Sequence, residues 1–322
     1  MTNPQPHGTR RAKAWLAAQQ WAITPEAFQT IVEIGSRQHE PDFDAVLARQ
    51  GELLTRGLDA QLRGDTAIIE VVGPIFRYAS MFSRISGATS VEQLAYELQA
   101  ALDSPRVKQV VLAIDSPGGA VTGISDFAKL LRGARKPVVA FVGGSAASAG
   151  YWIASAAPWV VVSDTALLGS IGVVSMLRVD ADVNVLEIVS SQSPNKRPDL
   201  KSDAGRAVVQ GVVDQLAGVF ISAVAIYRNT TPDRVIADFG GGSVLVGRAA
   251  VAADMADEVG TLEGLLAGFH RGEHPAVTRA LRQKAALAPH DVMASQVSHS
   301  ARPGDTSPVL ANRLHIVSHR RY

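Results

Sequence analysis

The chain has 322 residues, of which 47% are hydrophobic, 19% are charged and 6% are aromatic, and its formal net charge is +1. This composition is typical of a tightly packed α/β protein and argues against a disordered chain or a nucleic-acid-binding protein. The chain contains no cysteine, which excludes disulfides, a thiolate nucleophile and a cysteine-based zinc site.

The N-terminal segment, residues 1–65, is predicted to be mainly helical. A helix is expected to begin within residues 12–21. Thr24 followed by Pro25 marks a second helix start, because threonine caps helices and proline suits their first position. A further helical pattern covers Phe43–Leu54. We identify no chemistry in this segment and expect it to be an adaptor or an assembly surface.

No targeting or membrane segment is expected from the sequence. The N-terminus is polar and lacks the apolar core of a signal peptide. No uninterrupted apolar run approaches the ~20 residues that a membrane helix needs. We therefore expect a soluble, cytoplasmic protein without a membrane anchor. The small net charge gives no reason to expect a nucleic-acid partner.

Residues 66–270 are predicted to form one α/β domain, because apolar strands alternate with helical patterns along this part of the chain. Such alternation predicts a mainly parallel sheet built from right-handed crossovers. The expected strands are 66–72, 109–115, 138–142, 159–163, 183–189 and 244–246, and the expected helices are 90–102, 123–131, 148–157 and 202–228.

Residues 271–322 are predicted to be a basic, mobile tail, with eight Lys or Arg against three Asp or Glu. Pro, Ser and His occur here without periodicity. Five of the eight histidines lie in this tail, but their spacing matches no pattern of metal ligands, so we expect no metal site. No cofactor is expected either.

The most informative stretch is 141–157, in which Ser148 stands between a glycine-rich turn and the start of an apolar helix. A serine at such a turn has its hydroxyl near backbone N–H groups and the positive end of the helix dipole. Both stabilise a developing negative charge. From this stretch alone two interpretations stay open: Ser148 is a nucleophile, or it is an ordinary N-cap.

A second stretch, Asp115-Ser-Pro-Gly-Gly119, follows an almost wholly apolar strand and precedes a helix. Its two glycines, Gly118 and Gly119, allow backbone N–H groups to approach a ligand closely, as an oxyanion hole or an anion site requires. The Walker ending and the third glycine of a dinucleotide fingerprint are both missing. The alternative is a tight turn with glycines at positive φ.

A catalytic serine needs a base, and the sequence offers few. No histidine occurs between His39 and His270, so the expected α/β domain lacks the usual partner of a catalytic serine. A lysine whose pKa is lowered by desolvation is the known alternative base. Between Ser148 and residue 283 the only lysines are Lys196 and Lys201. Each is otherwise interpreted as a solvated surface lysine.

A third stretch, Gly169–Val174, contains Ser170, whose hydroxyl either orients a lysine or satisfies backbone groups at a turn. With Asp115–Gly119 and Ala146–Tyr151, it forms an ordered set of three motifs. This set resembles the signal peptide peptidase A family of serine peptidases, within the Clp and crotonase-like fold. The resemblance covers roughly residues 66–270.

The resemblance implies a role for each motif residue. Ser148 is the expected nucleophile and Ser170 the expected orienting hydroxyl. The backbone N–H groups of the oxyanion hole are expected at Gly118 or Gly119 and at Ala149. Many family members have glycine where this chain has Ala149, which is expected to narrow the pocket without removing the N–H group.

The resemblance also implies a base and a branch of the family. Members have a lysine about fifty residues after the serine, and Lys196 and Lys201 lie 48 and 53 residues after Ser148. The Ser-Pro-Asn-Lys-Arg context resembles that of phage and prophage members and favours Lys196. With no anchor expected, the chain resembles the phage-derived branch, whose members are similar to capsid-maturation proteases. A ring-like homo-oligomer is implied, in which serine and lysine from neighbouring subunits meet.

The function expected from these observations is a serine endopeptidase that cleaves peptide or protein substrates through an acyl-enzyme on Ser148, with Lys196 as base. The small residues Ala146, Ala147 and Ala149 favour small or apolar side chains before the scissile bond. Two alternatives stay open: an inactive scaffold or assembly protein on the same fold, and an acyl-CoA enzyme that holds a thioester enolate with glycine N–H groups.

Overall fold

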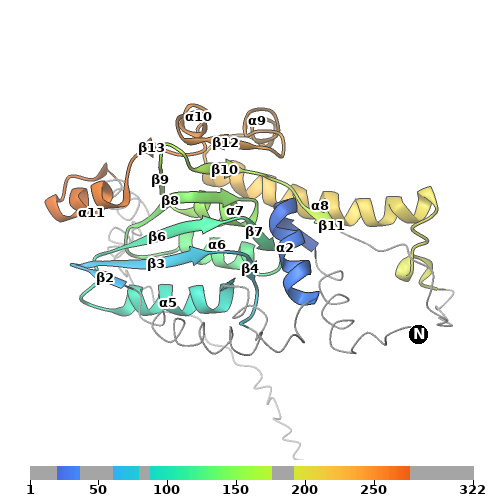
Figure 1. Cartoon of the computed structure of the whole chain (residues 1–322), viewed down its shortest axis with the longest axis horizontal. Helices are drawn as coiled ribbons and strands as arrows, with labels where there is room; N and C mark the ends of the chain where they lie inside the picture. The colour runs from blue at the N-terminus through green and yellow to red at the C-terminus, as the bar shows by residue number, and fades with distance from the viewer. Residues whose placement is uncertain (1–19, 37–60, 80–87, 176–191, 276–322) are drawn as a thin grey trace, which may run out of the picture. The chain divides into compact units, whose positions relative to one another are not determined.

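The structure is a computed structural model that describes residues 20–36, 61–79, 88–175 and 192–275. The expected helix 43–54, the expected strand 183–189 and almost all of the expected tail lie outside these residues. Figure 1 shows the arrangement of the described elements around a central sheet.

The central sheet has the strand order β12-β10-β8-β6-β3-β2, and β9 and β13 extend it beside β8. Neighbouring strands from β3 to β10 are parallel, and β2 and β12 are antiparallel to their neighbours. The expected mainly parallel sheet of an α/β domain is therefore confirmed. The strands are β2 (Gln61–Arg63), β3 (Thr66–Val72), β6 (Gln109–Ser116), β8 (Val138–Ala147), β9 (Trp159–Val162), β10 (Leu167–Gly169), β12 (Val244–Val246) and β13 (Glu258–Val259).

Helices cover both faces of this sheet. The larger apolar cluster joins one face to α5 (Val91–Asp103), α6 (Ile124–Arg132) and α7 (Ala149–Ala156). A smaller cluster joins the other face to α11 (Leu262–Arg271), since alternate side chains of a strand point to opposite faces. Every residue of α7 is buried, so the helix that follows Ser148 is fixed by the core.

A second sheet has the order β11-β1-β7-β4-β5 and lies beyond the carboxyl ends of β6 and β8. It contains the N-terminal strand of the described chain, between two strands from much later in the sequence. Its strands are β1 (Gln20–Ile23), β4 (Ile75–Phe76), β5 (Thr89–Ser90), β7 (Gly118–Ala120) and β11 (Val174–Ser175).

The N-terminal segment is only partly as predicted. The helix that begins with Thr24 and Pro25 is confirmed as α2 (Pro25–Ser36). The expectation of a helix up to residue 21 is wrong at its described end, because Gln20 and Trp21 belong to β1. Pairing with β7 and β11 outweighs the local helical pattern, and the Trp21 side chain is fully buried.

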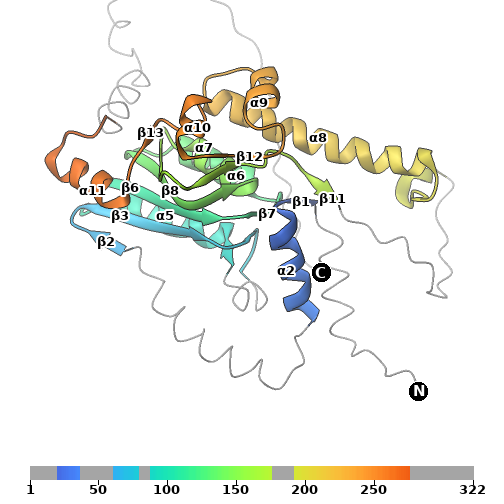
Figure 2. The same ribbon diagram turned by 45° about the horizontal axis from the view of Figure 1, so that its top comes forward.

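The helix α8 (Asp203–Tyr227) is confirmed, and it is unusually apolar for its exposure. It is long and apolar enough to cross a membrane, although only 17% of its most apolar window is buried and soluble proteins also contain such helices. Three exposed apolar side chains repeat at every seventh position, Val212, Val219 and Ile226. Figure 2 shows the N-terminal part of α8 reaching beyond the central sheet, with α9 (Pro232–Asp238) and α10 (Gly247–Ala252) near its other end.

Candidate active site

Ser148 lies at the junction between β8 and α7 with φ 53° and ψ −118°, a conformation that side chains of L-residues disfavour. Its backbone is held from both sides. The Ser148 N–H donates to the Gly169 carbonyl at 2.7 Å, and the Ser148 carbonyl accepts the Trp152 N–H at 3.0 Å. Residues kept in sparsely populated conformations by their surroundings cluster at functional sites.

The hydroxyl of Ser148 does not cap α7. Four other hydroxyl residues of this chain cap helices: each has an extended backbone, and each side chain accepts an N–H of the first turn. Ser148 has neither feature, and its Oγ instead makes a long hydrogen bond of 3.4 Å to the Gly172 carbonyl. The ordinary N-cap interpretation is therefore wrong. The capping residues are Ser90, Ser202, Thr231 and Thr261.

A β-bulge brings the second motif beside Ser148. The register of β6 and β8 shifts after Ile114, so that Ser116 lies opposite Ala146, two residues before Ser148. The carboxylate of Asp115 accepts the Ser145 N–H at 2.9 Å and so ties the bulged part of β8 to β6. Bulges of this kind redirect the chain next to active sites.

The two glycines of this motif stand where no larger residue fits. Gly118 has φ 101°, and a Cβ on it would lie 2.1 Å from the Ala22 carbonyl oxygen. A Cβ on Gly119 would lie 1.9 Å from the Ile75 carbonyl oxygen. The Gly118 N–H donates to Ser116 Oγ at 3.2 Å. Both glycines are therefore required for the close approach of the chain's own backbone, and the approach of their N–H groups to a ligand stays a prediction.

Ser170 lies next to Ser148 across two paired strands. Strand β10 runs parallel to β8 with Gly169 opposite Ala147, so each serine directly follows one member of this pair. Ser170 also has a positive φ, 51°, and its N–H donates to the Ser243 carbonyl at 2.6 Å. The segment from Gly169 onwards therefore meets Ser148 at two points, its N–H through the Gly169 carbonyl and its hydroxyl through the Gly172 carbonyl, and the orienting role of Ser170 stays a prediction.

The two candidate lysines lie elsewhere in this single chain. Lys196 ends the short 3₁₀ helix η1 (Pro194–Lys196), and both it and Lys201 are exposed. Among the described residues, no hydrogen bond joins either amine to Ser148. In Figures 1 and 2 the yellow segment that precedes α8 and holds both lysines lies away from α7. The choice of base stays a prediction.

Tyr151 is the titratable residue closest in sequence to Ser148. Burial raises its pKa above the ordinary value, and its hydroxyl donates to the Met255 carbonyl at 3.0 Å. Tyr151 therefore stays protonated and hydrogen-bonded, and it is not a candidate base.

Sequence reasoning missed two contributors to the site. Ser116 is fully buried, its Oγ donates to the Gly73 carbonyl at 2.7 Å, and it holds the Gly118 N–H in place. Ser116 lies within the motif Asp115–Gly119 described above. A serine just before Gly-Gly was therefore the signal from which its role could have been predicted. Strand β1 has no such signal, because it is short and pairs only with strands distant in sequence.

Comparison with known proteins gives two family matches over this region. Residues 131–271, which include both serines and both lysines, match the model of peptidase family S49. Residues 67–161, which include the two glycines, match the model of the Clp protease family. Over these residues the chain is similar to both peptidase families. The expected Clp-like fold and the expected family resemblance are thereby confirmed.

Several proteases and phage proteins are similar to this chain. Protease 4 of Salmonella typhi is 32% identical over 218 residues, which are 65% of this chain and 34% of that protein. Capsid assembly protease C of Escherichia phage lambda is 30% identical over 210 residues, 62% of this chain and 47% of that protein. The head-tail preconnector protein GP5 of Enterobacteria phage P21 is 26% identical over 238 residues, 69% and 47% respectively. The chain thus spans between a third and a half of these relatives.

We predict that Gly119→Ala destabilises the fold by about 1–3 kcal/mol, because the added Cβ collides with the Ile75 backbone and not with a flexible side chain. The matched control is Gly211→Ala in α8, where nothing lies within 4 Å of the added atom. This control is expected to gain about 0.5–1 kcal/mol. Urea unfolding followed by circular dichroism measures both. Equal stability of Gly119→Ala and wild type would contradict the tight packing of β7 against β4.

Proposed function

We propose that this protein is a serine endopeptidase in which Ser148 is the nucleophile. The observation that carries the proposal is the conformation of Ser148: strained, buried, fixed at both backbone ends, and not used to cap the helix it precedes. The similarity to peptidase family S49 supports the same reaction class. An inactive scaffold would have no need to keep this strain.

The reaction follows the acyl-enzyme route. Ser148 Oγ attacks the substrate carbonyl while a neutral lysine amine takes the hydroxyl proton. The backbone N–H of Ala149, at the N-terminus of α7, and that of Gly119 stabilise the oxyanion, because the Gly118 N–H already donates to Ser116 Oγ. The protonated lysine then gives its proton to the departing amine. Water hydrolyses the ester with the same lysine as base, which restores the serine.

Lys196 is the proposed base, with Ser170 holding its amine. A lysine acts as a base near neutral pH only when desolvation lowers its pKa. Lys196 is exposed in the isolated chain, so another surface has to cover it before it can serve. A neighbouring subunit would supply that surface, and we infer that the active form is a ring-like homo-oligomer whose sites combine Ser148 of one subunit with Lys196 of the next.

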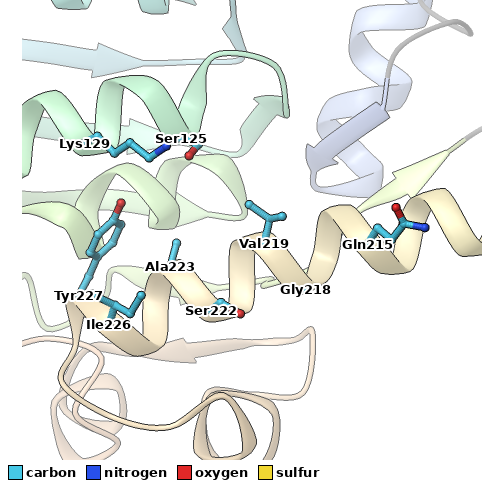
Figure 3. Close-up of a pocket in the computed structure, with 9 residues that line it drawn as sticks. All are labelled: Ser125, Lys129, Gln215, Gly218, Val219, Ser222, Ala223, Ile226 and Tyr227. Carbon is cyan, nitrogen blue, oxygen red and sulfur yellow. The ribbon is translucent and has the colours of Figure 1, made fainter.

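The exposed face of α8 supports assembly. A groove of about 660 Å³ lies between α6 and α8, and its lining on the α8 side consists mainly of small or apolar residues, including Val219 and Ile226 (Figure 3). These two side chains are 52% and 70% exposed, which is costly for an isolated chain in water. The residues around Ser148 do not line this groove, so we assign it to subunit contact and not to substrate.

The proposed substrates are proteins cut next to small or apolar residues. Two of the similar proteins are named for phage capsid assembly and head-tail connection. We extend this role to the chain and propose that it acts on capsid proteins in the cytoplasm of an infected cell. The exposure of α8 is assigned to subunit contact, so no membrane anchorage is proposed.

We predict that Ser148→Ala and Lys196→Ala each lower kcat on a protein substrate by several orders of magnitude, because either change removes one member of a unit that acts together. Lys201→Ala is the matched control and is expected to keep activity. Initial rates on one fluorogenic peptide compare the three variants. Loss of activity in Lys201→Ala with activity kept in Lys196→Ala would move the base to Lys201.

Co-expression of Ser148→Ala and Lys196→Ala subunits tests whether the dyad forms between chains. Each variant alone is expected to be inactive. In a random mixture about a quarter of the sites pair an intact serine with an intact lysine from the neighbouring subunit, so about a quarter of wild-type activity should return. Sequential purification through a different affinity tag on each variant confirms that mixed oligomers form. An inactive mixture would show that serine and lysine come from one chain.

A further inference from the structure

Strand β1 occupies the space between the glycine strand β7 and the strand β11. It pairs antiparallel with both: Ala22 lies opposite Gly119, and Gln20 lies opposite Ser175. Bonds from Thr24 N–H to the Pro117 carbonyl, at 3.0 Å, and from Val121 N–H to the Gln20 carbonyl, at 3.1 Å, flank this arrangement. Figure 2 shows β1 beside both partners.

This position is directly beside the proposed catalytic residues. A Cβ on Gly118 would lie 2.1 Å from the Ala22 carbonyl oxygen and 3.0 Å from the Ala147 carbonyl oxygen. The backbones of Ala22 and of the residue before Ser148 therefore approach the same glycine. By the alternation of antiparallel pairs, Ala22 and Gly119 form a hydrogen-bonded pair. The backbone of Gly119, a candidate donor to the oxyanion, is thus already paired with β1.

An extended peptide is most simply bound by adding it as a strand to an open sheet edge, where main-chain hydrogen bonds hold it. The glycine strand has two edges. One is paired with β4 through Ile75 and Gly119, and β1 pairs with the other. Within the described residues, β7 therefore offers no open edge to a substrate while β1 is in place.

The side chains of β1 match what a substrate would present. Trp21 and Ile23 face one way, into a small cluster with Phe28 and Phe76, where Trp21 meets each ring edge-on at centroid distances of 5.2 and 5.8 Å. Ala22 faces the other way and belongs to the main cluster that contains the small residues on either side of Ser148. Ala22, a small residue, thus lies on the side of β1 where small side chains of a substrate are expected to bind.

We propose that β1 is an intramolecular inhibitory strand that holds the place of an extended peptide substrate and has to leave before a substrate binds. This inference rests on the proposed peptidase function. The strand can leave with little disturbance of the main core, because it contributes only Ala22 there and its two large side chains pack in the separate cluster that α2 completes. The N-terminal segment then regulates access to Ser148.

A reversible disulfide across β1 and β11 tests the proposal in the full chain. Gln20→Cys and Ser175→Cys place two cysteines opposite each other in an antiparallel pair, at a spacing that a disulfide spans. The natural chain has no cysteine, so no other disulfide competes within one chain. We expect the oxidised form to cleave a fluorogenic peptide at least ~10-fold more slowly than the reduced form. Gln20→Cys alone is the control, with equal rates in both conditions.

A binding assay separates this proposal from the peptidase function. In the same double-cysteine chain carrying Ser148→Ala, a labelled peptide Gln-Trp-Ala-Ile-Thr-Pro is followed by fluorescence anisotropy. The reduced protein is expected to bind it at least ~10-fold more tightly than the oxidised protein. Equal binding in the two forms, or none in the reduced form, would overturn the inhibitory strand. If peptide binding depends on the redox state but the chain that retains Ser148 cleaves no peptide, the inhibitory role of β1 would be supported and the proposed peptidase activity would be refuted.

Discussion

The site depends on one constraint, the backbone of Ser148 held at positive φ between the Gly169 carbonyl and the first turn of α7. A non-glycine residue in such a conformation costs on the order of 1–3 kcal/mol. Burial of all eight residues of α7 offsets that cost, since the helix cannot move without exposing them. Strand β10 supplies the carbonyl only because it runs in register beside β8. The core therefore fixes the geometry from which the proposed chemistry follows.

Strand β7 is involved both in the proposed stabilisation of the oxyanion and in the access of a substrate to Ser148. Its glycines leave room for close backbone partners, and in this structure one of these partners is the chain's own N-terminal strand. A peptide and β1 would compete for identical main-chain groups, so the relative stability of the two pairings would set the fraction of accessible sites. The N-terminal segment, for which the sequence indicates no chemistry, then becomes part of the function.

Local patterns predict much of this molecule and long-range pairing limits the rest. The apolar run of β8, the small residues of α7 and the long helix α8 are read correctly, because their signals lie within each segment. Strand β1 is missed because its partners lie far along the chain and its own pattern is short. The interpretation of Ser148 as a helix cap is excluded only by the structure, in which its dihedral angles are not those of a capping residue. The choice of lysine stays a prediction, because no hydrogen bond among the described residues joins Lys196 or Lys201 to Ser148.

Reaction of the native protein with a fluorophosphonate probe, followed by peptide mapping in a mass spectrometer, shows whether Ser148 is the nucleophile. We expect the probe to modify Ser148 and no other serine, because among the described serines Ser148 is the one that we propose to combine a strained backbone with an oxyanion site and a base. Modification should disappear when the protein is unfolded before the reaction. An unmodified Ser148 in native protein that has assembled and been shown to bind peptide would contradict the proposed role of Ser148.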